Sequence, residues 1–222
     1  MTDPHRWPAP LASAASARYP LAMEIIVATG NAHKLGELAE LFPGHRLLRP
    51  VDVGHPGFDV VEDGKTFFEN ALIKAEALHK LTGRPVLADD SGLAVRALGG
   101  EPGIHSARYG SLDGKLKLEA PERNALLLKA VEDVGDRKCA FVCCLILMLS
   151  DERFFAVQES LEGELLRAPR GEGGFGYDPI VWVPSLGKSV AELSAAEKNA
   201  ISHRGRASRR MAAILADLDA AP

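Results

Sequence analysis

Cysteine and aromatic residues are scarce in this chain of 222 residues, which has three cysteines and 6% aromatic side chains. Cys139, Cys143 and Cys144 lie within one apolar stretch, and their spacing fits neither a CxxC redox pair nor a zinc site. Thiols in such a stretch are typical of buried, reduced cysteines that pack as small apolar groups. The cysteine pattern therefore argues against a disulfide framework, a zinc centre and thiol redox chemistry.

Long apolar runs and a strong excess of one charge are also lacking. The formal net charge is −4, so no global attraction would draw in a polyanion. The longest apolar run, from Cys139 to Leu149, falls short of the roughly 18 residues needed to span a bilayer. We therefore expect a cytoplasmic protein with neither a nucleic acid nor a membrane among its partners.

The beginning of the chain differs from the rest in composition. Residues 1–22 are rich in Ala, Pro and Ser and contain no apolar core of the length that a secretory signal has. The first β-branched apolar segment follows directly after Met23. We expect residues 1–22 to be a disordered extension and residues 23–222 to form a single domain.

Periodicity within residues 23–222 predicts strands and helices in alternation, and then a hairpin. Strands that alternate with helices, next to strands linked by a hairpin, favour an α/β fold with a mixed sheet. One helix begins with a capping box at Thr66 and Glu69. The expected strands are Glu24–Thr29, Arg46–Val51, Pro85–Ala88, Cys139–Leu149 and Arg153–Glu159, and the expected helices are Ala32–Phe42, Thr66–Thr82, Glu122–Val131, Val190–Asn199 and a C-terminal helix from about Ala207.

Two adjacent carboxylates and a hydroxyl, Asp89, Asp90 and Ser91, follow the expected strand Pro85–Ala88. Open α/β sheets bind ligands at the carboxyl ends of their strands. Adjacent acids at a buried position repel one another unless a cation joins them, which favours a Mg²⁺ site over a polar turn. Asp90 can orient a water molecule or hold the metal, and Glu62 is the candidate second ligand, with Glu69 and Asp89 as alternatives.

Two further segments could bind phosphate. The turn Thr29–Lys34 precedes a predicted helix, so its N–H groups and the Lys34 ammonium could cradle phosphate oxygens, although this segment taken alone favours a tight turn with an Asn31 cap. Lys198, His203 and Arg204 form a basic cluster, which could also be the solvated start of the last helix. Carboxylates for a hard cation together with separate cations for phosphate are the two halves of a nucleoside triphosphate site.

The glycines of Gly171-x-Gly173-x-x-Gly176 match the dinucleotide-binding pattern, but Tyr177-Asp178-Pro179 follows them where a helix would have to begin. We therefore reject a dinucleotide site, and also a P-loop at Gly187-Lys188-Ser189, where Trp182 stands at the required earlier glycine. Phe175 is either a core residue or a stacking platform for a flat base.

Taken together, these segments resemble the inosine/xanthosine triphosphate pyrophosphatase family in order and across nearly all of residues 24–217. The matching pieces are Thr29-Gly30-Asn31-x-x-Lys34, Thr66-Phe67-x-Glu69-Asn70-Ala71, Ala88-Asp89-Asp90-Ser91-Gly92-Leu93, Leu98-Gly99-Gly100-x-Pro102-Gly103-Ile104-x-Ser106-Ala107-Arg108-Tyr109, Gly173-Gly174-Phe175-Gly176-Tyr177-Asp178-Pro179 and Lys198-x-Ala200-x-Ser202-His203-Arg204. The chain departs from the family's pattern in its N-terminal extension and in the loop Ser111–Glu119, which is usually more acidic.

The resemblance implies an elongated mixed sheet flanked by helices, two lobes with a cleft between them, and a homodimer. It also implies Mg²⁺-dependent hydrolysis of ITP, dITP and XTP to the nucleoside monophosphate and pyrophosphate, which removes deaminated purines from the nucleotide pool. Carried over by position, Asp90 would be the catalytic residue and would bind the metal. The substrate would be bound by Thr29, Gly30, Asn31, Ala32, His33, Lys34, Ser91, Phe175, Gly176, Tyr177, Asp178, Lys198, His203 and Arg204.

Selection of a 6-keto purine needs hydrogen-bond donors that face O6, because adenine would leave such donors unpaired. His203 and Arg204 lie in the segment expected to supply them. Two alternatives stay open at this point. One is the septum-formation-inhibitor-like nucleotide pyrophosphatase family, which usually has a Ser/Arg-rich first loop where this chain has Thr-Gly-Asn-x-x-Lys. The other is a nucleotide-binding sensor without turnover, against which the paired acids Asp89 and Asp90 argue.

Overall fold

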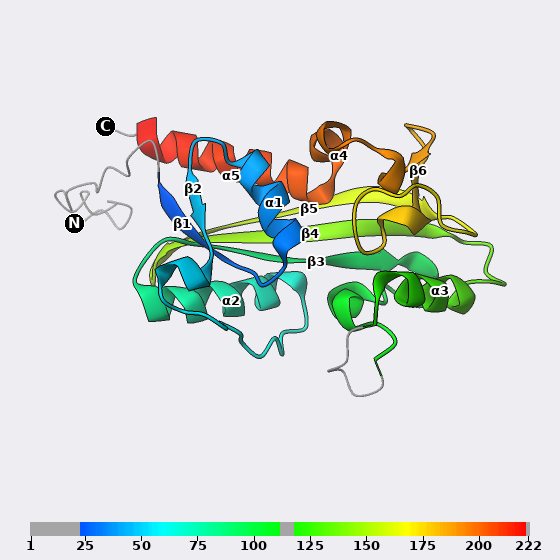
Figure 1. Ribbon diagram of the computed structural model, residues 1–222, viewed down its shortest axis with the longest axis horizontal. Helices are drawn as coiled ribbons and strands as arrows, with labels where there is room; N and C mark the ends of the chain where they lie inside the picture. Colours follow the sequence, from blue (N-terminus) through cyan, green and yellow to red (C-terminus); the bar gives the residue numbers. More distant parts are fainter. Residues whose placement is uncertain (1–22, 112–117, 221–222) are drawn as a thin grey trace, which may run out of the picture.

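The computed structural model describes residues 23–111 and 118–220, so the expected extension 1–22 and the middle of the loop Ser111–Glu119 lie outside the described residues. Figure 1 shows an elongated molecule whose long strands run along its length. The strands are β1 (Glu24–Ala28), β2 (Arg46–Leu48), β3 (Val86–Val95), β4 (Lys138–Ser150), β5 (Arg153–Leu165), β6 (Val181–Val183) and β7 (Lys188–Ser189). The α-helices are α1 (Ala32–Leu41), α2 (Phe67–Thr82), α3 (Ala120–Ala130), α4 (Ala195–Ile201) and α5 (His203–Ala220).

These strands form a seven-stranded sheet in the order β2-β1-β3-β4-β5-β6-β7. β1 pairs in parallel with β2 and β3, whereas every pair from β3 to β7 is antiparallel. The parallel part comes from the strand–helix–strand unit of β1, α1 and β2, and the antiparallel part begins with the β4–β5 hairpin. The expected α/β fold with a mixed sheet is confirmed.

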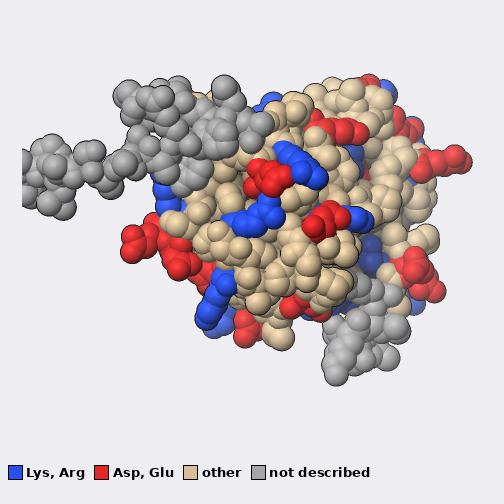
Figure 2. Space-filling view, turned by 60° about the vertical axis from the view of Figure 1, so that its left-hand side comes forward, with Lys and Arg blue, Asp and Glu red and all other residues tan. Residues whose placement is uncertain are grey.

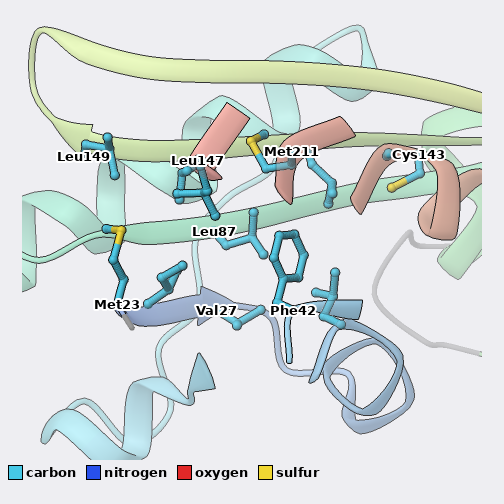
Figure 3. Packing of buried hydrophobic residues seen from close by; sticks show 13 residues of the cluster. Met23, Val27, Phe42, Leu87, Cys143, Leu147, Leu149 and Met211 are labelled. Carbon is cyan, nitrogen blue, oxygen red and sulfur yellow. The ribbon is translucent and has the colours of Figure 1, made fainter. Parts of the chain in front are cut away.

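Helices cover both faces of the sheet near β1, where its core is thickest. α1 and α5 lie over one face and α2 over the other (Figure 1). On the first face, Phe42 after α1 and Met211 of α5 meet Leu87, Cys143 and Leu147 of the sheet, and all five are at most 1% exposed (Figure 3). A separate apolar cluster lies toward the other end, where Leu127 of α3 packs with strand residues. The core thus holds the ends of β1 and α1 firmly against β3.

β3 differs from its prediction, and the difference relocates the acidic pair. The strand was expected to end at Ala88, but it continues to Val95 because β4 pairs with it from Val86 through Val95. Only the parallel partner stops there, since the β1–β3 pairing ends at Ala28 and Ala88. Asp89 and Asp90 therefore lie inside a strand, just beyond the carboxyl end of β1. The expectation that they follow the end of their own strand was wrong.

Other strands and helices also begin or end at residues that differ from the prediction. β5 extends past Glu159 to Leu165, since β4 pairs with it as far as Glu164. The expected helix Val190–Asn199 is broken into a 3₁₀ turn at Val190–Glu192 and α4, because Ser194 starts a new helix with a capping box to Glu197. Among the described residues, no helix is long and apolar enough to cross a membrane.

Candidate active site

The polar side chains of the site lie on both faces of β3, beyond the end of β1. Successive strand residues point to opposite faces, so Asp89 shares the face of Leu87 and Cys143, which α5 covers, while Asp90 shares the face of Ala88, which α2 covers. The two carboxylates are adjacent in the chain, yet each meets its own set of cations. Their mutual repulsion is relieved without a shared metal ion.

On the α2 side, Asp90 is paired with Lys74. The Lys74 ammonium lies 2.7 Å from Oδ1 of Asp90 and 2.9 Å from Oε2 of Glu62, so it bridges both carboxylates. The other oxygen of Asp90, Oδ2, is buried and has no hydrogen-bond partner. Burial raises the pKa of Asp90 to about 6, while the positive charge of Lys74 opposes the shift. Asp90 is therefore ionised near neutral pH, and one of its oxygens is buried without a hydrogen-bond partner.

The oxygen atoms of Asp90 and Glu62 suit a hard cation. Mg²⁺ in nucleotide sites is held by one or two carboxylates together with waters and substrate phosphates, so a full cage of protein ligands is not needed. In keeping with this, residues 23–111 and 118–220 contain no group of three or more His, Cys, Asp or Glu placed to hold a metal. Of the alternative ligands, Glu69 accepts a hydrogen bond of 2.5 Å from the N–H of Lys65, and Asp89 points to the opposite face of β3.

On the α5 side, the carboxylate of Asp89 is fully buried and accepts four hydrogen bonds. Oδ1 accepts from Lys34 Nζ at 2.5 Å and from Ser91 Oγ at 2.9 Å. Oδ2 accepts from Arg204 Nε at 2.9 Å and from Cys143 Sγ at 3.3 Å. Although burial opposes ionisation, the charges of Arg204 and Lys34 hold the pKa of Asp89 well below its usual value. Asp89 is thus a permanent anion that joins α1, β4 and α5.

A series of ion pairs continues from Arg204 toward the glycine-rich loop. The Arg204 guanidinium lies 2.5 Å from Glu37, and the other oxygen of Glu37 lies 2.7 Å from Lys198. Lys198 in turn lies 2.7 Å from Asp178. Arg204 and Lys198 are buried, which rules out the solvated start of a helix as the role of this basic cluster.

The turn before α1 is both a helix cap and a link to the site. The Asn31 side chain accepts hydrogen bonds from the N–H groups of His33 and Lys34, at 2.9 and 3.4 Å, so the predicted cap is confirmed. The Asn31 N–H donates to Oγ1 of Thr29 at 3.1 Å, which closes the turn over Gly30 and leaves Ala32 as the first residue of the helix. The turn thereby places Lys34 in the first turn of α1, from which its ammonium reaches Asp89 of β3.

Phe175 is half-buried and lies among the same cations. Its ring stacks on the His33 imidazole, with 5.2 Å between centroids and 13° between planes, and Lys198 Nζ lies 4.4 Å from its centroid. The loop around it is fixed by hydrogen bonds: Asp178 Oδ2 accepts from the Phe175 N–H at 2.8 Å, and the Tyr177 hydroxyl donates to the Ser106 carbonyl at 2.9 Å. Phe175 therefore lies beside charged groups and outside the apolar clusters of the described residues.

Gly174 and Gly176 help to fix the conformation of this loop. Gly174 has a φ of +71°, and a Cβ there would lie 2.1 Å from Oδ2 of Asp178, so only glycine allows that carboxylate to reach the loop. The Gly176 carbonyl accepts a hydrogen bond of 3.0 Å from the Asn124 side chain. The glycines serve a loop conformation, in line with the rejection of a dinucleotide fingerprint.

His203 lies within the apolar part of the site. Its ring stacks on Phe141 with 4.9 Å between centroids, and its Nδ1 is buried without a partner. Burial and the neighbouring positive charge of Arg204 lower the pKa of His203 well below its ordinary value. His203 is therefore neutral at physiological pH and can donate from only one ring nitrogen.

The structure also brings in two charged residues that the sequence analysis missed, Lys74 and Glu37. Lys74 follows Asn70 and Ala71 on the buried face of α2, so a lysine on an apolar helix face was the available signal. Glu37 follows Lys34 by one helical turn in α1, a spacing equally common in solvated surface pairs. Only the fold shows that both residues face the acids and cations of the site.

Comparisons with known proteins identify relatives of the chain. Residues 25–214 match the model of the Ham1 family. The chain is 51% identical to a protein from Treponema denticola named dITP/XTP pyrophosphatase, over 83% of this chain and 94% of that protein. It is 48% identical to a protein of the same name from Thermus thermophilus, over 85% of this chain and 90% of the relative.

Solved structures show the same architecture. The Ham1 protein of Coxiella burnetii has a TM-score of 0.80 and 41% identity, over 88% of this chain and 99% of that chain. The Ham1 protein of Staphylococcus aureus has a TM-score of 0.78 and 39% identity, over 87% of this chain and 98% of that chain. The likeness therefore extends over the site as well as the sheet.

Proposed function

Because the chain belongs to the Ham1 family, we propose that it hydrolyses dITP, ITP and XTP to the nucleoside monophosphate and pyrophosphate. One observation carries the proposal. A buried carboxylate with an unpaired oxygen, Asp90, lies on the opposite face of β3 from Arg204 and Lys198, two cations that flank the Phe175 ring. The membership favours this activity over a septum-formation-inhibitor-like enzyme, and the relatives' names favour turnover over a silent sensor.

Cleavage of the α–β anhydride needs an activated water and neutralisation of the leaving pyrophosphate. With a pKa of about 6, Asp90 is ionised at neutral pH. It can accept a proton from that water at Oδ2, the oxygen without a hydrogen-bond partner. The ammonium of Lys74 fixes the orientation of the carboxylate through Oδ1. Asp90 and Glu62 would hold Mg²⁺, which when bound neutralises charge on the phosphate oxygens.

Phosphate binding is assigned to the beginning of α1. Its N-terminal N–H groups and positive dipole end favour any phosphate, and the Lys34 ammonium has donors beyond the one given to Asp89. The protein's mild net negative charge leaves this local arrangement to attract a triphosphate. On the face shown in Figure 2, basic and acidic side chains lie next to one another and do not form a large patch of one sign.

Base binding is assigned to Phe175 and its surroundings. The ring already stacks on the His33 imidazole, and we assign the purine to this aromatic pair, where the neighbouring glycines leave room for a base. Donors for O6 would come from Arg204, which already gives three nitrogens to Asp89, Glu37 and Ser91, and from neutral His203. A 6-amino purine would leave such a donor unpaired, and a buried unpaired donor costs about 1–3 kcal/mol.

The proposal includes three finer points that follow the family resemblance: Mg²⁺ as cofactor, a homodimer as the assembly and the cytoplasm as the compartment. A substrate screen tests the reaction itself. Pyrophosphate release is measured from dITP, ITP, XTP, GTP and ATP, with Mg²⁺ and with excess chelator. We expect much faster turnover of the first three than of GTP and ATP, and turnover only with the metal. Equal turnover of GTP and ATP, or turnover in chelator, would contradict the proposal.

A further inference from the structure

We propose that Asp89 is a positioning residue and not a metal ligand. We further propose that the ion pairs in which it takes part couple phosphate binding at Lys34 to base stacking at Phe175. The proposal rests on the proposed function. It concerns whether binding at the phosphate site changes the affinity of the base site. The presence of two adjacent acids in the sequence does not indicate such coupling.

The surroundings of Asp89 leave no room for a metal bond. A carboxylate offers about four lone-pair positions, and Asp89 uses four, two on each oxygen. Its side chain is 0% exposed, whereas Asp90 retains a buried oxygen without any partner. A cation that bound Asp89 would have to break a hydrogen bond to Lys34, Arg204, Ser91 or Cys143. Of the two neighbouring acids, Asp90 is the one prepared for a ligand.

The ion pairs from Lys34 to the glycine-rich loop alternate in sign without interruption. Each inner member contacts an opposite charge on both sides, at N–O distances of 2.5 to 2.9 Å. The last carboxylate, Asp178, accepts the backbone N–H of Phe175. The full series is Lys34, Asp89, Arg204, Glu37, Lys198 and Asp178, and we call it the ion-pair series. It joins the proposed phosphate site to the backbone of the proposed base platform.

Such a series can couple two binding sites because each inner residue contacts two oppositely charged neighbours. A phosphate that accepts a further hydrogen bond from Lys34 fixes the ammonium against Asp89, and Asp89 in turn holds Arg204, which holds Glu37. Because most of these groups are shielded from water, salt screens them weakly and each change is felt by the next pair. A base on Phe175 and a phosphate on Lys34 therefore order the same contacts, so the second ligand loses less conformational entropy than the first.

The experiment uses the two halves of the substrate as separate ligands. Calorimetry measures the affinity of inosine in the absence and in the presence of saturating tripolyphosphate, with the full chain and without hydrolysis. In the wild type, we expect tripolyphosphate to tighten inosine binding by about fivefold or more. Glu37→Gln should reduce this factor to near one, since it breaks the series at its centre.

Glu40→Gln is the matched control for Glu37→Gln. Glu40 lies one turn further along α1 and accepts a hydrogen bond of 2.7 Å from Asn199 of α4, but it is not part of the ion-pair series. The control should keep the wild-type coupling. Independent binding of the two ligands in the wild type, or coupling that survives Glu37→Gln, would overturn the proposal.

A second measurement separates positioning from metal binding. Mg²⁺ binding in the presence of tripolyphosphate should change less than about threefold in Asp89→Asn and weaken about tenfold or more in Asp90→Asn. Equal loss in both variants would make Asp89 a metal ligand. If Asp89→Asn does not fold, Glu37→Gln decides the coupling, because the Glu37 side chain is 17% exposed and tolerates the change better. Turnover of dITP with independent binding of the two ligands would leave the proposed function intact and refute this inference alone.

Discussion

Asp90 differs from its neighbour Asp89 because burial raises the pKa of one acid while two cations lower that of the other. If ionised Asp90 accepts the proton of water, kcat/KM should fall about tenfold per pH unit below the pKa of Asp90, which bound Mg²⁺ would lower from its metal-free value of about 6. Asp90→Asn should lose more than about 90% of kcat, a barrier increase of at least about 1.4 kcal/mol, with no acid limb left in the residual activity. A pH–rate series on both proteins checks this, and an unchanged acid limb in the variant would assign the titration to another group.

The same carboxylate should destabilise the fold at neutral pH. Its pKa is about 6 in the folded protein and near 3.8 in the unfolded chain, so the neutral form is favoured in the fold and stability decreases as pH rises from about 4 to 6. Asp90→Asn cannot ionise and should be more stable than the wild type at pH 8 by on the order of 1–3 kcal/mol. Melting curves without Mg²⁺ should show a gap that closes toward pH 4. A less stable variant at pH 8 would mean that the pairing with Lys74 outweighs burial.

Lys34 should matter for phosphate and not for the choice of base. Removing its ammonium with Lys34→Ala should lower kcat/KM for ITP and GTP by a similar factor, because both carry the same triphosphate. The ratio of the two values is therefore expected to stay within about twofold of the wild-type ratio. A variant that changed this ratio strongly would indicate that the Lys34–Asp89 contact also shapes the base site.

At the scale of elements, a neighbouring segment approaches β3 closely at Gly92, just beyond the acids. A Cβ at Gly92 would lie 2.3 Å from the Gly103 carbonyl oxygen and 2.4 Å from Ser106 Oγ, and the carbonyl belongs to backbone that cannot rotate away. Gly92→Ala should therefore destabilise the protein by about 2 kcal/mol or more and lower activity through the displaced strand.

Replacing Gly36 of α1 by alanine should have the opposite effect on stability to Gly92→Ala. Nothing lies within 4 Å of a Cβ built there, and the residue is inside a helix. Gly36→Ala should stabilise the protein by about 0.5–1 kcal/mol, because alanine loses less backbone freedom on folding. Denaturant curves of both variants test the pair, and a destabilised Gly36→Ala would show that α1 needs its flexibility to hold Lys34.

At the scale of the whole molecule, residues 1–22 are rich in Ala, Pro and Ser and offer no apolar pattern that could pack, whereas Met23 is 4% exposed. A chain that begins at Met23 should therefore keep its melting temperature within about 3 °C and its kcat/KM within about twofold. Thermal melting and dITP hydrolysis of the shortened chain measure both. A drop of ten degrees or more would show that residues 1–22 contribute contacts to the fold.

The sequence by itself determined the features that depend on near neighbours. The caps at Asn31 and Thr66 join residues two or three positions apart, and both are present as predicted. The type of most elements, the mixed sheet and the family followed from periodicity and from the order of the motifs. One detail of the capping box differs, since Glu69 accepts from the N–H of Lys65, one residue before the cap.

Only the tertiary structure decided which charged residues form ion pairs with one another. β3 continues past Ala88 because β4 pairs with it, and the strand alternation then sends Asp89 and Asp90 to opposite faces. Arg204 reaches Asp89 across 115 residues and Glu37 across 167 residues of sequence. Local propensity contains no information on such distant pairs, because their free energy depends on the burial and alignment that the assembled sheet and helices create.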